Sequence, residues 1–312
     1  METLRINFLD FWKDFDKKNN YFYNLLSEKY QIIIDENNPE LIFYSCFGQE
    51  HLKYSCKKIF YTGENIRPNF LECDFAFSFD YNSRKNHYRL PLYSLYIEHH
   101  NMFDKLRVNR SEKELKEIWA TKNKFCCMVV SNPNSKERIN FFKKLSKIKK
   151  IDSGGSVLNN VGGRVKDKME FINNYKFVMS FENELYDGYT TEKILEPIVM
   201  DSIPIYWGNK KVNLDFNPKR FINYYDFDSE EDLFNRIVEI ENNPELAIEI
   251  IKQPIFAKGK IEYKKERENI LYEIIKVYKS EKKPIAKTFW LYIYKLKLNL
   301  HKLKKRLKKS FF

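Results

Sequence analysis

Short apolar runs alternate with amphipathic stretches through the first third of the chain. The apolar runs have the length of buried strands, and the amphipathic stretch at 20–28 has the period of a helix. The strand-like runs are residues 4–11, 31–35, 41–46, 58–61 and 75–79. Such an alternation predicts α/β units built around a parallel sheet.

The remainder of the chain repeats this pattern after a charged, helical stretch at 97–122. We expect strands at 125–130, 177–181 and 203–207, a helix at 136–146, a glycine-containing turn at 153–156 and a further helix after Thr190. Beyond Glu230 the sequence is rich in Glu, Lys, Ile and Leu, which predicts a few helices packed over the sheet. The second half is therefore another doubly wound α/β pattern.

Two domains and a tail fit this layout. With 312 residues and 43% hydrophobic content, the chain can bury two modest cores. We place a first domain at 1–117, a second at 118–283 and a basic amphipathic tail at 284–312. An alternative prediction is that the last helices of the second domain pack back on the first domain.

The net charge of +12 is concentrated toward the C-terminal end. From Lys287 to Lys309 there are nine Lys or Arg residues and no acidic one, so the rest of the chain is only mildly basic. A basic chain suits nucleic acid, a membrane surface or an anionic substrate. No N-terminal segment combines a basic stretch, an apolar run and a small-residue cleavage site, so we expect a cytoplasmic protein.

The stretch at 175–227 has the layout of an anion-binding site. The strand at 177–181 leads through a loop to Thr190, whose hydroxyl suits an N-cap, with Glu192 and Lys193 in the first helical turn. A helix N-terminus at the carboxyl edge of a parallel sheet offers free N–H groups to phosphate. Lys193 adds a positive charge, and Glu192 suits a ribose or sugar hydroxyl. A purely structural interpretation stays open, because Glu at a helix start is favourable anyway and Lys is usually solvated.

Three parts of the chain resemble one enzyme family. Within 175–227 the blocks F-E-N, G-Y-x-T-E-K-I, I-P-I-Y-W-G and F-N-P-x-x-F-I-N follow one another, and this order resembles the donor-binding signature of the α1,3-fucosyltransferases, glycosyltransferase family 10. Residues 60–70, FYTGENIRPNF, resemble the family's acceptor-side block. The segment SNPN at 131–134, followed by Arg138, resembles a third block.

The resemblance implies a fold and an activity. The fold is GT-B, with two Rossmann-like domains facing each other across a cleft. The activity is inverting transfer of L-fucose from GDP-β-L-fucose to the 3-hydroxyl of N-acetylglucosamine in a galactosyl-N-acetylglucosamine acceptor. The resemblance thereby implies Lewis-type fucosylation of a bacterial surface glycan such as lipopolysaccharide.

The resemblance also implies roles for particular residues. Glu64 would be the general base, which agrees with the need for a carboxylate that takes the acceptor proton during one displacement. A solvated turn residue is the alternative for Glu64. Arg138 would clamp the diphosphate of the donor and, with Lys193, neutralise the departing GDP. Asn183 and Tyr189 are further candidates for contacts with phosphate or sugar.

No metal site is expected. The five cysteines and five histidines lack the spacing of metal ligands, and the histidines are expected at the surface. The one Asp-x-Asp element considered, Asp226 to Asp228, follows the F-I-N block and fits a structural role. GDP-fucose is therefore expected to be used without an essential metal.

Two other functions stay open. Another GDP-sugar transferase on the same fold is one, since a fold does not determine the sugar. A nucleic-acid-binding protein is the other, suggested by the charge and by aromatic residues among the tail lysines. Activity of a 1–283 fragment would separate these classes.

The tail has the spacing of an amphipathic helix. Its apolar positions are Ile293, Leu296, Leu300, Leu303 and Leu307, with lysines between them. We expect it to bind an anionic membrane surface, which would place the enzyme at the inner face of the cytoplasmic membrane. The alternatives are packing on the enzyme itself or pairing with another copy.

Overall fold

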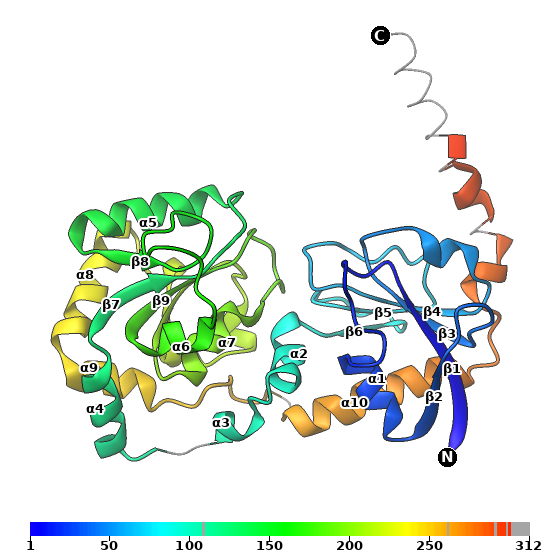
Figure 1. Ribbon diagram of the computed structural model, residues 1–312, viewed down its shortest axis with the longest axis horizontal. Coiled ribbons are helices and arrows are strands. Elements are labelled where there is room, and N and C mark those ends of the chain that lie inside the picture. Colours follow the sequence, from blue (N-terminus) through cyan, green and yellow to red (C-terminus); the bar gives the residue numbers. More distant parts are fainter. Residues whose placement is uncertain (108–109, 261, 290–291, 298, 301–312) are drawn as a thin grey trace, which may run out of the picture. The chain divides into compact units, whose positions relative to one another are not determined.

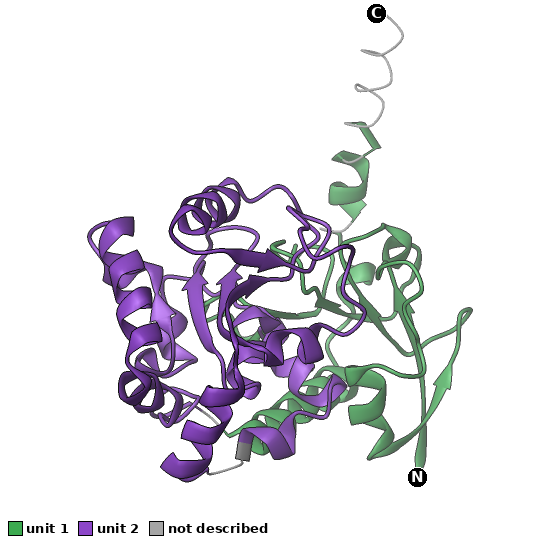
Figure 2. Cartoon of the chain, turned by 60° about the vertical axis from the view of Figure 1, so that its left-hand side comes forward, with its two compact units in different colours: residues 1–90, 261–312 green, residues 91–260 purple. Residues whose placement is uncertain are grey.

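The computed structural model describes residues 1–107, 110–260, 262–289, 292–297 and 299–300. They form two compact units (Figure 2). Unit 1 consists of Met1–Leu90 together with Ile261–Phe312, and unit 2 is Pro91–Lys260. Each unit contains a parallel β-sheet, so the predicted α/β class is confirmed.

Unit 1 has a six-stranded sheet in the order β2-β1-β3-β4-β5-β6 (Figure 1). Its strands are β1 (Glu2–Leu9), β2 (Tyr30–Ile34), β3 (Leu41–Tyr44), β4 (Lys57–Tyr61), β5 (Phe75–Ser78) and β6 (His87–Arg89). Helices α1 (Tyr21–Ser27) and α10 (Tyr263–Lys279) contact each other, and the 3-10 turns are η1 (Glu50–Lys53) and η5 (Ile285–Lys287). The rings of Phe8 and Phe22 both stack on Phe43, which packs α1 on the sheet.

Unit 2 has a five-stranded sheet in the order β11-β10-β9-β7-β8. Its strands are β7 (Lys124–Met128), β8 (Ile151–Ser153), β9 (Tyr175–Phe181), β10 (Ile203–Trp207) and β11 (Ile222–Asn223). Its helices are α2 (Leu92–His99), α3 (Phe103–Arg107), α4 (Glu112–Thr121), α5 (Lys136–Ile148), α6 (Lys168–Asn173), α7 (Glu192–Val199), α8 (Glu230–Asn242) and α9 (Pro244–Ile251), with 3-10 turns η2 (Val212–Leu214), η3 (Pro218–Arg220) and η4 (Tyr224–Asp226).

Helices cover both faces of the unit 2 sheet (Figure 1). Helices α4, α5, α8 and α9 share one apolar core with alternate residues of β9, namely Phe177, Met179 and Phe181. Val178, between them in sequence, packs with Ile172 of α6 in a separate cluster. This period of two is what a strand buried on both faces requires.

The compact units are divided differently from the predicted boundaries at 117 and 283. Residues 91–121 belong to unit 2, because α2 packs on α7 and α4 packs on α9. Helix α10 belongs to unit 1, where it packs on α1 and β4.

The tail is described in part. Residues 292–297 are helical, and Leu296 and Leu300 are exposed. Lys295 Nζ donates a hydrogen bond to Leu52 O at 2.6 Å, within unit 1. Residues 301–312, with the last two leucines of the predicted stripe, lie outside the described residues. Within the described part of the chain, no helix has both the length and the apolar character needed to cross a membrane.

One histidine contradicts the surface prediction. His51 is only 3% exposed. Its Nδ1 lies 2.6 Å from Asp10 Oδ2 and its Nε2 lies 3.2 Å from Glu72 Oε2, while the ring stacks on Tyr44. The prediction was wrong because both carboxylates are distant from His51 in sequence, so spacing could not reveal them.

Candidate active site

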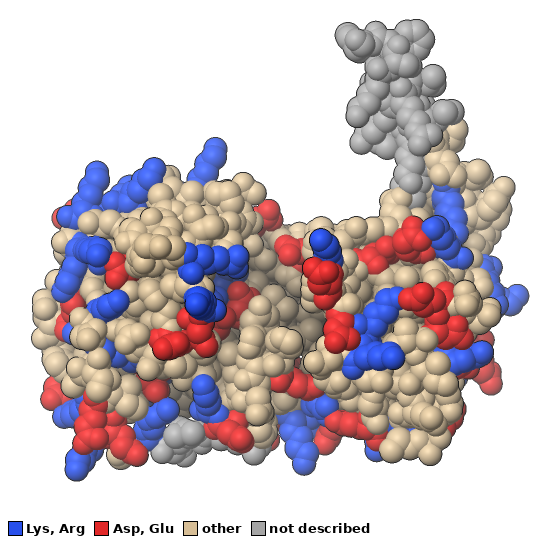
Figure 3. Space-filling model, in the orientation of Figure 1, with Lys and Arg blue, Asp and Glu red and all other residues tan. Residues whose placement is uncertain are grey.

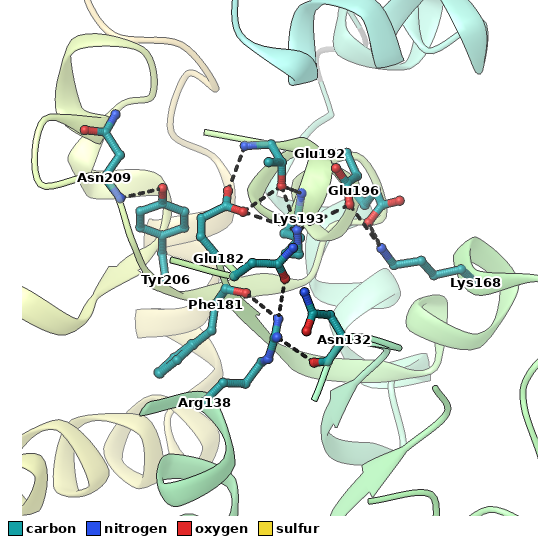
Figure 4. Close-up of polar contacts among 12 residues, drawn as sticks. Asn132, Arg138, Lys168, Phe181, Glu182, Glu192, Lys193, Glu196, Tyr206 and Asn209 are labelled. Atoms are coloured by element: carbon teal, nitrogen blue, oxygen red, sulfur yellow. Dashed lines mark hydrogen bonds and ion pairs between the residues drawn. The ribbon is translucent and has the colours of Figure 1, made fainter. Parts of the chain in front are cut away.

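The parallel strands of unit 2 end along one edge of the sheet, and polar residues gather there (Figure 4). Ligands of such sheets bind at this edge. Contacts and mutual electrostatic effects connect five of the six predicted site residues at this edge: Arg138, Asn183, Tyr189, Glu192 and Lys193. The sixth, Glu64, belongs to unit 1.

Helix α7 begins one residue later than predicted. Its N-cap is Thr191, whose side chain accepts a hydrogen bond from Lys193 N, and Glu192 is the first helical residue. Thr190 has another partner, because its hydroxyl accepts a hydrogen bond from Asn209 Nδ2 at 2.9 Å. Pro197 lies inside α7, and the helix continues across it to Val199. Pro197 therefore does not end the helix that carries the candidate site.

Glu182, directly after β9, is the hub of the site. It is 0% exposed and accepts hydrogen bonds from Thr191 N and Thr191 Oγ1, both at 2.7 Å. Its other contact is Lys193 Nζ at 3.2 Å. A side chain at Gly208, where φ is +151°, would put its Cβ 2.6 Å from Glu182 Cγ, so glycine is required there. Glu182 therefore positions both the N-cap and the ammonium group.

The acidic neighbours of Lys193 favour its charged form. Burial alone lowers the pKa of Lys193, but the charges of Glu182 and Glu192 outweigh burial and raise it. Burial raises the pKa of Glu182, against the opposing effect of Lys193. A fixed positive charge at a helix N-terminus suits a phosphate oxygen.

Glu192 lies between two cations. Its carboxylate is 3.7 Å from Lys193 Nζ and 3.9 Å from Lys168 Nζ, and Lys168 also pairs with Glu196. Burial acts to raise the pKa of Glu192, but both lysines outweigh burial and lower it. An ionised carboxylate repels a diphosphate and accepts hydrogen bonds from hydroxyl groups. The electrostatics therefore favours the predicted sugar or ribose hydroxyl as the partner of Glu192.

Arg138 on α5 is 0% exposed and faces oxygen atoms of the chain. Nη1 donates to Phe181 O at 3.1 Å and to Asn183 Oδ1 at 3.2 Å, and Nη2 donates to Asn132 O at 2.9 Å. Burial lowers the pKa of Arg138, and the nearby charge of Glu182 acts against this. Arg138 thus joins α5 to the end of β9 and to the loop that follows β7. Its clamp on a diphosphate stays a prediction.

Asn209 supports the loop that carries Tyr189. Asn209 Oδ1 accepts a hydrogen bond from Gly188 N at 2.8 Å, and Asn209 N donates to the hydroxyl of Tyr206 at 3.1 Å. Tyr189 itself is buried. Sequence reasoning did not select Asn209 or Glu182. Glu182 is the first residue after β9, and Asn209 is the second residue after β10. Polar residues at strand ends were the signal that could have identified both.

Glu64 lies just beyond β4 and is exposed. Its backbone N–H donates to Thr62 Oγ1 at 3.1 Å, and Thr62 is buried. The buried Thr62 hydroxyl thus holds the backbone of this turn, while the Glu64 side chain is accessible to solvent. A base that takes a proton from a bound acceptor needs this accessibility.

The described residues contain no group of three or more His, Cys, Asp or Glu side chains that could hold a metal ion. Asp226 Oδ1 accepts a hydrogen bond from Asn223 Nδ2 at 3.1 Å in the turn η4, which fits the structural role predicted for the Asp-x-Asp element.

Comparisons with known proteins agree with this geometry. Residues 6–96 match the family model of the α-(1,3)-fucosyltransferase FucT N-terminal domain, and residues 119–250 match that of the glycosyltransferase family 10 (fucosyltransferase) C-terminal part. The α-(1,3)-fucosyltransferase FucT of Helicobacter pylori is 35% identical over 261 residues, covering 72% of this chain and 54% of the relative. A mouse 4-galactosyl-N-acetylglucosaminide 3-α-L-fucosyltransferase is 32% identical over 131 residues, covering 40% of this chain and 36% of the relative. The chain spans about half the length of the Helicobacter relative, and less of the mouse one.

Solved structures give the same picture. A crystal structure of an α1,3-fucosyltransferase with GDP-fucose matches with a TM-score of 0.75 at 29% identity, covering 90% of this chain and 92% of that chain. An Anabaena protein crystallised with UDP and glucose matches with a TM-score of 0.52 at 8% identity, covering 87% and 99%, which shows the fold alone. The GT-B-like fold expected from the resemblance is confirmed. Since two fucosyltransferase models match successive parts of the chain and the structural match spans 90% of it, the chain belongs to glycosyltransferase family 10.

Proposed function

We propose that the chain is an inverting α1,3-fucosyltransferase. It transfers L-fucose from GDP-β-L-fucose to the 3-hydroxyl of N-acetylglucosamine in a galactosyl-N-acetylglucosamine glycan, as in Lewis-type decoration of a bacterial surface polysaccharide. The observation that carries the proposal is the fixed cation at the N-terminus of α7, where Lys193 is held by Glu182 at 3.2 Å. The GDP-fucose in the similar crystal structure supports the choice of donor, and the α-(1,3) names of the relatives support the choice of linkage.

The reaction is a single displacement. The acceptor oxygen attacks the anomeric carbon of fucose while Glu64 takes its proton, and the bond from that carbon to the GDP oxygen breaks. Attack from the side opposite GDP converts the β-linked donor into an α-linked product. The electron pair leaves with GDP, and Lys193 and Arg138 stabilise the negative charge that develops there.

The other contacts orient the donor. Glu192 accepts a hydrogen bond from a ribose or fucose hydroxyl, and Asn183 and Tyr189 contact phosphate or sugar. Glu192 suits this role because it is ionised between Lys193 and Lys168. No essential metal takes part in this scheme.

A donor panel tests the proposal. GDP release from GDP-fucose, GDP-mannose and UDP-galactose is measured with and without N-acetyllactosamine, and the product linkage is determined by NMR. We expect acceptor-dependent turnover of GDP-fucose and an α1,3 linkage. Preference for another GDP-sugar would instead support the alternative transferase, and a different linkage would overturn the acceptor assignment.

The tail at 284–312 anchors the enzyme to the inner face of the cytoplasmic membrane. Exposed Phe289 and Tyr292 suit the headgroup boundary, and each nearby Lys or Arg adds about 1 kcal/mol of attraction to anionic lipid.

The surface charge does not favour the alternative of a nucleic-acid-binding protein. On the face shown in Figure 3, basic and acidic side chains are interspersed on both units, whereas a nucleic-acid binder presents a basic stripe.

Co-sedimentation with anionic vesicles tests the anchor. The full chain is expected to bind at low salt and to dissociate at high salt, whereas a 1–283 fragment stays in solution. Equal partitioning of the two forms would contradict the anchor. The contact between Lys295 and Leu52 favours the competing idea that part of the tail packs on the enzyme.

A further inference from the structure

Four neighbouring strands of the unit 1 sheet are followed by a row of exposed side chains that includes the candidate base. In the order β1-β3-β4-β5, the third residue after each strand is Trp12, Phe47, Glu64 and Tyr81. Trp12 and Phe47 are each 52% exposed, and Tyr81 is 37% exposed. A single exposed apolar residue is normal on a protein surface, whereas aromatic side chains gathered at one edge of a sheet mark a candidate binding surface.

Hydrogen bonds connect the loops at this edge. Phe47 N donates to Asp10 O at 2.9 Å, which joins the loop after β3 to the loop after β1. Cys46 Sγ lies 3.2 Å from Thr62 Oγ1, which joins the loop after β3 to the loop after β4. The same Thr62 oxygen accepts the hydrogen bond from Glu64 N. The loop that carries Phe47 is thus fixed both to the loop after β1 and to the turn of the candidate base.

The buried His51 holds the same three loops together. It follows β3, and its ring nitrogens contact Asp10 in the loop after β1 and Glu72 in the loop after β4. The ring of Trp12 is itself held edge-to-face on Phe15, with 4.9 Å between the ring centroids. Loops and rings that are ordered in advance lose little freedom when a ligand binds.

We propose that Trp12 and Phe47 form a stacking platform for sugar units of the acceptor glycan that lie beyond the N-acetylglucosamine receiving fucose. The face of an aromatic ring is apolar and carries a partial negative charge, so it attracts the C–H groups on the apolar face of a pyranose. Ligands of parallel sheets bind at the carboxyl edge, where these rings and Glu64 lie. This role rests on the proposed transfer and deepens it, because it assigns the residues that select the length of the acceptor.

The order of the strands supports the choice of these two rings. Neighbouring strands lie about 4.8 Å apart, so at the level of the sheet β3 and β1 are roughly 5 Å and 10 Å from β4, which leads to Glu64. Sugar units next to the reacting one can cover this distance. Tyr81 on the other side is less suited, because the guanidinium of Arg89 already lies 4.2 Å from the centre of its ring.

The dependence of transfer on acceptor length tests the platform. Transfer to N-acetyllactosamine and to a glycan of three N-acetyllactosamine repeats is measured for the wild type, Trp12→Ala and Phe47→Ala. The matched control is Tyr272→Ala, which removes a 63% exposed aromatic side chain from α10. The KM for the long glycan is expected to rise roughly five-fold or more in the two platform variants, in line with the strength of an aromatic contact. Their kcat, their KM for GDP-fucose and their KM for the short acceptor should match those of the control.

Two further arms separate stacking from a structural role. Trp12→Tyr keeps an aromatic face and should retain most of the affinity for the long glycan, whereas Trp12→Leu keeps apolar bulk and should lose it. If the contact with Phe15 makes the Trp12 variants fail to fold, Phe47→Ala decides the question. Saturation-transfer NMR with the long glycan alone, without GDP-fucose, reports on binding even where no transfer takes place.

Particular outcomes overturn the platform. It is refuted if both alanine variants use the long glycan as the Tyr272→Ala control does, or if the KM rises equally for the short and the long acceptor. Changed self-association in sedimentation velocity with an unchanged KM would assign the rings to an interface between copies. Absence of transfer by the wild type overturns the proposed function alone, and NMR binding of the long glycan that depends on Trp12 or Phe47 would then still support the platform.

Discussion

The carboxylate of Glu182 lies 3.2 Å from the ammonium group of Lys193, at the point where β9 ends and α7 begins. Two hydrogen bonds from Thr191 hold the same carboxylate in place. The cation is therefore oriented before any ligand arrives. Preorganised charge of this kind stabilises a developing anion without reorganisation during the reaction.

Glu182→Gln is expected to weaken both the fold and the donor site. The neutral amide leaves Lys193 without its main charged partner, so the free energy of unfolding should fall by about 3–5 kcal/mol. The KM for GDP-fucose should rise as the ammonium group loses its position. Urea unfolding and steady-state kinetics measure the two effects, with exposed Glu231→Gln as control. A variant as stable as the control, with an unchanged KM, would remove Glu182 from this role.

Lys193→Ala and Arg138→Lys distinguish a residue whose charge stabilises the donor from a residue whose hydrogen bonds only hold the fold together. Lys193→Ala removes the fixed cation, so GDP affinity and turnover should both fall, turnover by roughly a hundred-fold. Arg138→Lys keeps a charge but loses the hydrogen bonds that join Phe181 and Asn132 to α5. If Arg138 contacts the donor, GDP affinity falls in the folded variant. If only the melting temperature falls and GDP affinity is unchanged, Arg138 is a support and the predicted clamp is wrong.

Chelation should leave the activity unchanged. The proposed stabilisation of GDP relies on Lys193 and Arg138, so removal of divalent cations by EDTA takes away no required charge. Initial rates with and without EDTA, after extensive dialysis, measure this. Inhibition by EDTA that is reversed by Mn²⁺ would contradict the scheme.

His51 is expected to make stability depend on pH. Burial lowers the pKa of His51, but Asp10 and Glu72 outweigh burial and raise it above its usual range. A raised pKa stabilises the fold below about pH 6.5, and this contribution is lost as pH rises through the folded pKa. Burial lowers the pKa of Lys58 to about 8. Because Lys58 therefore loses its proton more readily in the folded state, its contribution to stability increases as the pH rises above about 8, opposite to the contribution of His51.

Urea unfolding of the wild type and His51→Gln between about pH 6 and pH 8 isolates this effect. The stability advantage of the wild type should be greatest at the acid end of this range and shrink as pH rises. An advantage that stays constant over the range would show that folding does not shift the pKa of His51.

Sequence patterns predicted the framework because strands and their ends have local signatures. The strand at 177–181 and the helix at 136–146 appear as β9 and α5. The domain to which helix α10 belongs was harder to predict, because the sequence of an amphipathic helix does not reveal which surface its apolar face packs against. Its packing on unit 1 depends on residues from the other end of the chain.

The candidate site was only partly accessible from sequence. Lys193 and Glu192 were identified because they begin a helix after a buried strand. Glu182 was missed as the hub, since its importance depends on Thr191 and Lys193 folding back onto it. The roles assigned to the site residues stay predictions until the variants are measured.

The most direct test of the account is the rate of fucose transfer from GDP-fucose to N-acetyllactosamine by the wild type and by Glu64→Gln, with GDP affinity measured on the same preparations. The account predicts transfer by the wild type, a loss of about two orders of magnitude or more in the variant, and unchanged GDP affinity, because Glu64 moves a proton and does not hold the donor. No transfer by the wild type, or a variant within a few-fold of it, would contradict the account.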